Sequence, residues 1–463
     1  MPSSWLGLNT ALSALAASQL ALDTAAHNTA NASTPGYSRQ RVNLVESAPF
    51  TYPAFNRSGL PGQLGTGVSV ATIERVRDSF LDLQVRGQLT LQGQWQTRSD
   101  ELAKVESIFP EPGGSGLGTA LNTFWNAWQD LAADPTSSAA RSALVGQAGT
   151  LVQQFNGAAG QLQGLIDGVD YQVGQQVSQI NGLAAKIASL NEQIQRVTVT
   201  GDHPNDLADQ RDLVLDQLSA ILPVTTVQKS DGTVTVLVAG TDLVEHGTAR
   251  TMTTVADANG HKVPTWSTGG TVALGSSQLG TLVSVRDVTL VGFLGQLNTL
   301  AKGIVDNVNA LQNPPPGGGT DFFTCTAGSE ASTIAVNAAV VANPSLVVTG
   351  SGGPGDGSIA GQIADLRNLK YFVGGTQTAS GFYANIIGAI GSDAQQANAM
   401  STNEGLVVNQ LTMRRESVSG VSLDEEATDM IRFQRAYQAA ARIITIVDET
   451  LDVLINRTGM VGR

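Results

Sequence analysis

Apolar residues near the carboxyl end of the chain repeat at alternating spacings of three and four, which is the heptad pattern of a coiled-coil helix. The outermost position of the same heptad is polar in every repeat. The pattern predicts a helix over about residues 422–456 with one seam that packs against a partner helix. The predicted seam residues are Met430, Phe433, Tyr437, Ala440, Ile444, Val447, Leu451 and Leu454.

A second apolar stripe lies in the amino-terminal segment, where residues 4–31 are predicted to form another helix. Neither helix can bury its stripe alone, so we predict that the two ends of the chain pair as a coiled coil. An ordinary helix buried in a globular core is the alternative for the carboxyl-terminal segment. The predicted seam residues of the amino-terminal helix are Leu8, Leu12, Leu15 and Leu22.

The start of the carboxyl-terminal helix is marked by a capping-box spacing between Ser422 and Glu425, and by acidic residues that suit the positive end of a helix dipole. This helix also carries apolar residues off its seam, which a two-stranded coiled coil would leave exposed. Such a second stripe predicts contacts with other subunits. It is formed by Ile431, Ile443, Ile446, Val453 and Ile455.

Helical periodicity dominates the rest of the chain, interrupted by one stretch with the period of strands. Helices are predicted over residues 77–109, 121–131, 139–165, 169–197, 205–222, 282–311 and 359–415. Strands are predicted over 224–228, 234–238, 243–244, 263–266 and 271–274, with a hairpin turn at Asp231-Gly232, and short extended pieces over 38–76.

The predicted fold is therefore mainly α with an inserted β domain, in which the terminal helices pair as a coiled coil. Residues 1–50 and 410–463 are expected to form the terminal coiled-coil domain. A long helical-bundle middle domain takes up 51–222 and 282–409, including an irregular Gly- and Pro-rich region at 312–358. A small β domain at 223–281 is expected at the outer tip.

Composition excludes several function classes. The chain has 463 residues and a net charge of −13, which argues against a nucleic-acid surface and against binding to acidic lipid. Residues 1–38 contain no Lys or Arg, so no cleavable export signal is predicted, and no apolar run is expected to span a membrane. The chain is thus expected to be cytoplasmic, or to leave the cell by a route that reads another signal.

Candidate chemistry is sparse. The single cysteine, Cys325, and four scattered histidines predict neither a disulfide nor a metal site. The Gly-rich segment 114–118 lacks the Lys-Ser/Thr of a phosphate loop and is interpreted as a linker. The pair Asp209 and Asp212 could serve a glycosidase, but it is interpreted as a solvated helix face with local pairing around Arg211. No catalytic, cofactor-binding or metal-binding residue is predicted, and we expect no enzyme.

Several motifs resemble one protein family. The run Asn28-Thr-Ala-Asn-Ala-Ser-Thr-Pro-Gly-Tyr37 resembles the signature of the flagellar axial proteins, which include rod, hook and hook-associated proteins. The motif residues are Asn31, Thr34, Pro35, Gly36 and Tyr37. Segments 420–426 and 433–442 are similar to the same family, as are the internal segments 131–141 and 205–212. The form of the first motif is most similar to the hook-associated proteins, and the resemblance covers essentially the whole chain.

The resemblance implies a structural component that joins hook to filament as a polymerised junction ring, exported through the flagellar type III apparatus to the extracellular flagellum. The implied partners are other copies of the chain, the hook protein below, a second junction protein towards the filament, and a cytoplasmic export chaperone at the C-terminal helix; no nucleic acid and no membrane insertion are expected. Another axial rod or hook component, or a hydrolase carried on an axial scaffold, are the alternatives. The triple proline at 314–316 and the Gly-rich stretches between 309 and 356 depart from the family pattern, so a reduced outer region is expected.

Overall fold

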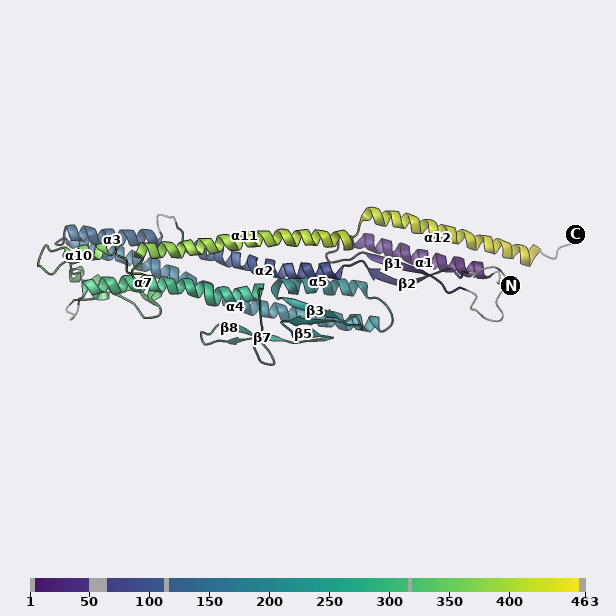
Figure 1. The fold of residues 1–463 in the computed structure, drawn as a ribbon, viewed down its shortest axis with the longest axis horizontal. Helices are drawn as coiled ribbons and strands as arrows, with labels where there is room; N and C mark the ends of the chain where they lie inside the picture. Colours follow the sequence, from purple (N-terminus) through teal and green to yellow (C-terminus); the bar gives the residue numbers. More distant parts are fainter. Residues whose placement is uncertain (1–4, 50–64, 112–115, 315–318, 458–463) are drawn as a thin grey trace. The chain divides into compact units, whose positions relative to one another are not determined.

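The computed structural model describes residues 5–49, 65–111, 116–314 and 319–457, and most of the triple proline lies outside these ranges. The chain divides into two compact units. The terminal unit comprises Met1–Leu89, Ile180–Thr251 and Leu406–Arg463, and the middle unit comprises Thr90–Gln179 and Met252–Gly405. The chain is mainly helical with small antiparallel sheets, which confirms the predicted fold class (Figure 1). The domain boundaries and the position of the β domain at an outer tip stay predictions.

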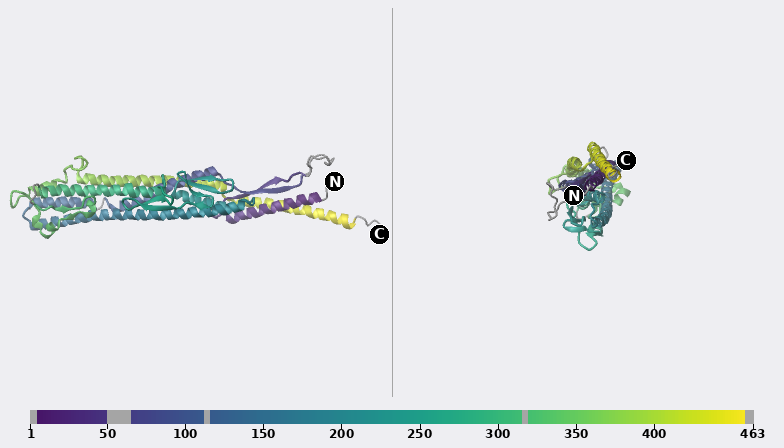
Figure 2. Two further views of the ribbon diagram at one scale, coloured as in Figure 1. Left: turned by 90° about the horizontal axis from the view of Figure 1, so that it is seen from below. Right: turned by 90° about the vertical axis from the view of Figure 1, so that its right-hand side faces the viewer.

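In the terminal unit, helix α1 (Trp5–Asn31) pairs with helix α12 (Leu423–Asp452), which continues as the π-helical turn η3 (Val453–Arg457). The two helices lie side by side and antiparallel in Figures 1 and 2. The predicted pairing of the two chain ends is therefore confirmed. The predicted seam residues of α12 from Met430 to Leu451 are buried or half-buried, whereas Leu454 is 56% exposed.

The buried face of α1 is one residue out of step with the predicted leucine stripe. Leu12 is 48% exposed, and Leu8, Leu15 and Leu22 are only half-buried. A heptad of mostly small residues forms this face instead: Ala11, Ser18, Ala21, Ala25 and Asn28 are buried, and Ala14 is half-buried. Leucines dominate a hydrophobic pattern, but small side chains allow two helix backbones to approach closely, and here packing follows the small residues.

The terminal unit also contains antiparallel β structure. Strand β1 (Gln40–Glu46) pairs antiparallel with β2 (Val68–Arg75), as the short alternating runs predicted. A four-stranded antiparallel sheet has the order β3-β4-β5-β6, with a turn at Asp231-Gly232 where Gly232 has φ +82°. Its strands are β3 (Val224–Gln228), β4 (Val234–Val238), β5 (Thr241–Glu245) and β6 (Thr248–Ala249). The short strand β6 was not predicted.

Helix α4 (Ser138–Thr198) is continuous, so the prediction of two separate helices over 139–165 and 169–197 is wrong. The predicted break fell at Asp167-Gly168, where a glycine costs a helix about 1 kcal/mol. Ile166 and Val169 on either side are 2% and 0% exposed, and their burial outweighs that cost. The other helices that were predicted are α2 (Ser79–Ile108), α3 (Leu117–Ala133), α5 (Asn205–Ile221), α7 (Val291–Gln312), α10 (Ser358–Asp365) and α11 (Ala379–Ser419).

In the middle unit, α3 packs against α10, and α10 packs against α7. The core of this unit is aromatic, and its rings include Phe124, Trp125, Trp128, Phe322 and Phe323. A two-stranded sheet joins β7 (Met252–Ala256) to β8 (Lys262–Trp266). The predicted strand over 271–274 is wrong, because only Thr271 forms a single bridge, to Thr265.

The remaining elements of the middle unit are short. They are α6 (Gln278–Ser284), the π-helix η1 (Val285–Leu290), β9 (Phe323–Thr324), α8 (Glu330–Thr333), β10 (Ala335–Val336), α9 (Ala338–Ala342) and the 3-10 turn η2 (Pro344–Leu346). The helical segment Gln278–Gln312 is long and apolar enough to cross a membrane by length and composition, contrary to the sequence-based expectation. Its side chains Leu282, Leu297 and Leu300 are at most 1% exposed inside the unit, as in the core helix of a soluble fold.

Candidate assembly site

Asn28 is the polar residue at which the paired terminal helices meet. It ends the small-residue heptad of α1 and is 1% exposed. Its amide Nδ2 donates to the Glu426 carboxylate at 3.1 Å and to the Gln40 carbonyl at 2.9 Å. Its Oδ1 accepts from the Tyr37 hydroxyl at 2.7 Å and from the Gln40 backbone N–H at 2.9 Å. One side chain therefore links α1, the motif turn, β1 and α12 with every hydrogen-bonding position used.

Glu426 brings a charge into this junction and Arg39 neutralises it. Glu426 is 2% exposed, and the Nε of Arg39 donates to it at 2.7 Å. Arg39 also contacts Glu425 at 2.6 Å, and its backbone N–H donates to the Ser419 carbonyl at 2.8 Å. Burial by itself would lower the pKa of Arg39, but the Glu426 and Glu425 carboxylates outweigh it and raise that pKa. Substituting either Arg39 or Glu426 with a neutral residue would leave the charge of the other without its partner in a buried site.

The predicted capping box is only half correct. Ser422 is the N-cap of α12, but its side chain makes no capping hydrogen bond. Glu425, which would complete the box, reaches Arg39 instead. A charge-assisted contact with a guanidinium is stronger than a bond to a neutral backbone N–H, which explains why the ion pair replaces the cap.

The motif after α1 forms a compact turn. Asn31 donates from Nδ2 to the His27 carbonyl at 3.0 Å, and its Oδ1 accepts from the Thr34 hydroxyl at 3.1 Å. The Thr34 carbonyl accepts a hydrogen bond from the Tyr37 backbone N–H at 3.1 Å, which closes the turn over residues 34–37. Pro35 is exposed and fixes the backbone between them.

Two further residues of the motif have demanding positions. Gly36 has φ +80°, and a Cβ there would lie 3.2 Å from the Leu213 Cβ of α5, so both backbone and space favour glycine. The Tyr37 ring packs edge-on against His27 at 5.5 Å between centroids. Burial, with help from nearby carboxylates, raises the pKa of Tyr37 and keeps its hydroxyl a donor to Asn28. The five motif residues therefore form the turn that positions the α1–α12 junction.

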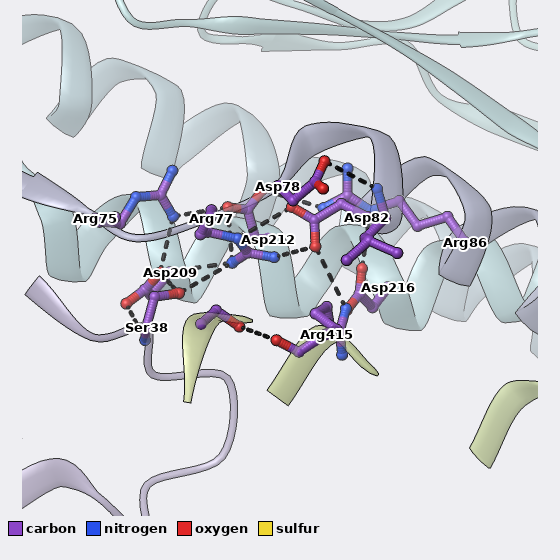
Figure 3. Close-up of polar contacts among 12 residues, drawn as sticks. Ser38, Arg75, Arg77, Asp78, Asp82, Arg86, Asp209, Asp212, Asp216 and Arg415 are labelled. Atoms are coloured by element: carbon purple, nitrogen blue, oxygen red, sulfur yellow. Dashed lines mark hydrogen bonds and ion pairs between the residues drawn. The ribbon is translucent and has the colours of Figure 1, made fainter. Parts of the chain in front are cut away.

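A cluster of arginines and aspartates lies next to this turn in the terminal unit (Figure 3). Ser38, which follows the motif, donates to Asp209 from its backbone N–H at 2.8 Å and from its hydroxyl at 2.7 Å. Asp212 on the same helix contacts three arginines at 2.7, 3.1 and 3.1 Å. These arginines are Arg75 at the end of β2, Arg77 between β2 and α2, and Arg86 of α2.

The cluster extends to the carboxyl-terminal part of the chain through Asp216. Asp216 pairs with Arg86 at 2.8 Å and with Arg415 of α11 at 2.7 Å. The interpretation of Asp209 and Asp212 as a solvated helix face is therefore wrong, since Asp209 is 5% exposed and pairs with residues far away in sequence. Their carboxylates join β2, α2, α5 and the segment after α1.

Charge complementarity holds the cluster together. Burial alone would raise the pKa of Asp212, but Arg77, Arg75 and Arg86 outweigh it and lower the pKa to about 2. Burial likewise opposes the charge of Arg77, yet Asp212 and Asp82 raise its pKa above the ordinary value. Each of these groups therefore stays charged at neutral pH. Their role is to hold the surrounding elements together, not to transfer protons.

Two surface features remain open to partners. A groove of about 540 Å³ runs between the motif turn and the α11–α12 connection, lined by residues such as Pro35, Arg415 and Gly420. The off-seam residues of α12 and of the following turn η3 are exposed as predicted, at 45–74%. They are Ile431, Ile443, Ile446, Val453 and Ile455. No group of three or more His, Cys, Asp or Glu side chains in the described part of the chain is arranged to hold a metal ion.

Comparison with known proteins decides between the families that share such motifs. A family model described as the helical domain of the flagellar hook-associated protein FlgK matches residues 102–321. Models of the flagellar basal body rod protein and of the C-terminal region of the rod FlgEFG proteins match residues 8–37 and 415–457. Flagellar hook-associated protein 1 of Bacillus subtilis is 33% identical to this chain, with 100% of both chains covered. The chain belongs to the flagellar hook-associated protein 1 family.

Other members of the hook-associated protein 1 family agree. The protein from Escherichia coli is 28% identical, with 97% of this chain and 99% of that protein covered. The solved structure of the flagellar hook junction protein FlgK from Burkholderia pseudomallei matches with a TM-score of 0.65 at 18% identity, covering 73% of this chain and 100% of that one. This last likeness supports the fold alone.

In this chain, the sequence predicts the motif but not the contacts that its neighbours make. Asn28, Arg39 and Glu426 form the polar junction, and none of them was a predicted site residue. One signal pointed to Asn28: it continues the heptad of small residues on α1, where a polar side chain is unexpected unless it has a buried partner.

Proposed function

We propose that this chain is a structural component of the bacterial flagellum that joins the hook to the filament by polymerising into a junction ring. The full-length similarity to flagellar hook-associated protein 1 carries this proposal. The paired terminal helices support it, because their buried polar junction fixes one geometry of the two chain ends. No catalytic, cofactor-binding or metal-binding role is proposed for any residue.

The partners follow from which surface of α12 remains uncovered. Its seam faces α1, while Ile431, Ile446 and Ile455 are 58–74% exposed. Exposed apolar stripes of this kind mark contacts with other proteins. We assign this face to neighbouring subunits of the ring, to the hook protein below and to a second junction protein towards the filament.

The same face needs protection before assembly. A heterologous interface that does not close on itself leads to premature polymerisation. We therefore propose that a cytoplasmic export chaperone holds the C-terminal helix before export through the flagellar type III apparatus, and that the chain acts outside the cell, at the hook–filament junction.

Electron microscopy of a deletion strain tests the junction role. Hooks without filaments, restored by the wild-type gene, are expected. A strain without hooks would instead point to a rod or hook component, and normal filaments would contradict any junction role. A lytic defect in the cell wall with normal filaments would favour the hydrolase alternative.

Two adjacent isoleucines separate the seam from the outer face. Ile444 lies on the predicted seam and is half-buried, whereas Ile443 is 48% exposed. Ile444→Asp places an unpaired charge in the half-buried seam, which costs several kcal/mol. It should abolish both hydrogen-exchange protection of α1 and filament attachment. Ile443→Asp should preserve the protection but impair attachment, and equal protection in both variants would contradict the seam assignment.

A further inference from the structure

A pocket of about 380 Å³ in the terminal unit lies between the first turns of α2, helix α5 and the edge formed by β3 and β4. Four arginine side chains and two carboxylates line it: Arg75, Arg77, Arg86, Arg211, Asp82 and Asp212. Both carboxylates are already engaged. Asp212 contacts Arg75, Arg77 and Arg86, and Asp82 contacts Arg77 at 2.6 Å. Outside the lining, Asp209 pairs with Arg75 and Asp216 pairs with Arg86, each at 2.8 Å, so three of the four arginines have carboxylate partners.

The fourth arginine of the lining is Arg211. It is 2% exposed, and its Nη1 donates to the Gly232 carbonyl at 2.7 Å and to the Asn191 Oδ1 at 3.1 Å. Its Nε is buried without a hydrogen-bond partner, and Arg211 forms no ion pair with any residue in the described ranges. Burial, together with repulsion from Arg75 and Arg86, lowers the pKa of Arg211 to about 10 in spite of the attraction of Asp212.

A buried cation without a counterion is costly, and proteins retain one where a partner supplies the opposite charge. Guanidinium groups recognise planar or tetrahedral oxyanions through several N–H donors at once. Thr226 and Gln228 of β3 lie on the same lining and add a hydroxyl and an amide at its rim. The pocket thus offers charge, donors and room for a small oxyanion.

We propose that this pocket binds one oxyanion, which pairs with Arg211. The anion has two possible sources: free inorganic phosphate, or an acidic side chain of an adjoining subunit. The second source rests on the proposed junction function, whereas the pocket itself does not. In either case the anion would stabilise the joint between α2, α5 and the β3–β6 sheet.

The test uses the purified full-length chain and inorganic phosphate. Phosphate, exchanged for chloride at constant ionic strength, should raise Tm saturably by about 2–4 °C. Gln228→Glu supplies a carboxylate at the rim, so it should raise Tm in chloride and remove most of the phosphate response. Gln84→Glu on α2 is the matched control, because Gln84 is exposed and lies outside the pocket lining. It should keep the full response.

Arg211→Gln should also remove the phosphate-dependent rise in Tm. If Arg211→Gln does not fold, Gln228→Glu still tests the proposal. An equal phosphate response in the wild type, Gln228→Glu and Gln84→Glu, or no response in any of them, would overturn the proposal. Motility separates the two sources. If Gln228→Glu blocks junction formation while Gln84→Glu does not, the anion is a subunit carboxylate; if both assemble normally, it is free phosphate.

Discussion

Asn28 shows how much of the terminal unit depends on one side chain. It supplies both donors and both acceptor positions to α12, the motif turn and β1. Buried amides are costly when a partner is removed, since each abandoned group loses both water and its protein contact. Substituting the exposed motif residues Thr34 or Pro35 would leave no comparable buried polar group without a partner.

Asn28→Ala should therefore lower the free energy of unfolding by about 2–4 kcal/mol. The substitution leaves the Tyr37 hydroxyl and the Glu426 Oε2 without the hydrogen bonds that Asn28 makes to them in a buried site. Urea denaturation measures this loss. Asn31→Ala is the control, since Asn31 is half-buried and bonds only within its own turn. It should cost about 1 kcal/mol or less, and equal losses would show that the junction is not where the energy lies.

Acid should weaken the chain through Asp212. The pKa of this carboxyl is about 2 in the folded chain against an ordinary value of 3.8, so the unfolded chain binds more protons between these values. Its contribution of about 2 kcal/mol is complete above pH 4 and disappears as the pH falls towards 2. Asp212→Asn should lower stability at neutral pH and flatten this acid limb in pH-dependent denaturation. Asp206→Asn, on the exposed face of the same helix, should leave the limb unchanged.

Elements with a strong period could be predicted from the sequence, and those decided by packing could not. The heptad of α12 predicted positions from Met430 to Leu451 that are buried or half-buried, but also the exposed Leu454, whereas α1 buries alanines beside the leucines that dominate its pattern. Asp167-Gly168 looked like a break in α4, yet the neighbouring buried side chains carry the helix through it. The arginine–aspartate cluster was missed because its members are brought together only by the fold, and the spacing of Asp209 and Asp212 contains no sign of Arg75 or Arg86.

Helix α7 offers a test of packing within one element. A Cβ at Gly303 would overlap the ring of Phe372, which is 4% exposed, whereas Gly295 of the same helix has open space around it. Gly303→Ala should destabilise the chain by about 1–3 kcal/mol through overpacking. Gly295→Ala should stabilise it by about 0.5–1 kcal/mol, because alanine favours a helix. Thermal denaturation distinguishes the two, and a stabilised Gly303→Ala would show that α7 does not pack on Phe372.

At the scale of the whole molecule, the strands predicted as one inserted β domain divide between the two compact units. The sheet β3–β6 belongs to the terminal unit, where Asn191 bonds the Val234 backbone and the His246 carbonyl. The β7–β8 hairpin belongs to the middle unit, where Lys262 contacts Asp170 at 2.8 Å. Each unit therefore has its own β structure, and the effect of deleting each piece can be tested separately.

Deleting the sheet should have a much larger effect than deleting the hairpin. The sheet buries side chains that include Val236, Val238, Leu243 and Val244, each at most 1% exposed. At about 1.5–3 kcal/mol each, their loss approaches the whole stability of a domain, about 5–15 kcal/mol. Removal of residues 224–249 should therefore give an insoluble chain that restores no filaments.

Replacing residues 252–270 with a short Gly–Ser linker should be tolerated. Arg286 loses the Lys262 carbonyl but keeps its ion pairs with Asp170 at 2.6 Å and Asp287 at 2.7 Å, so no buried charge is left alone. Circular dichroism should show a helical, cooperatively melting chain, and the variant should restore filaments in the deletion strain. A soluble, exported hairpin variant that forms no junction would place an essential subunit contact on β7–β8.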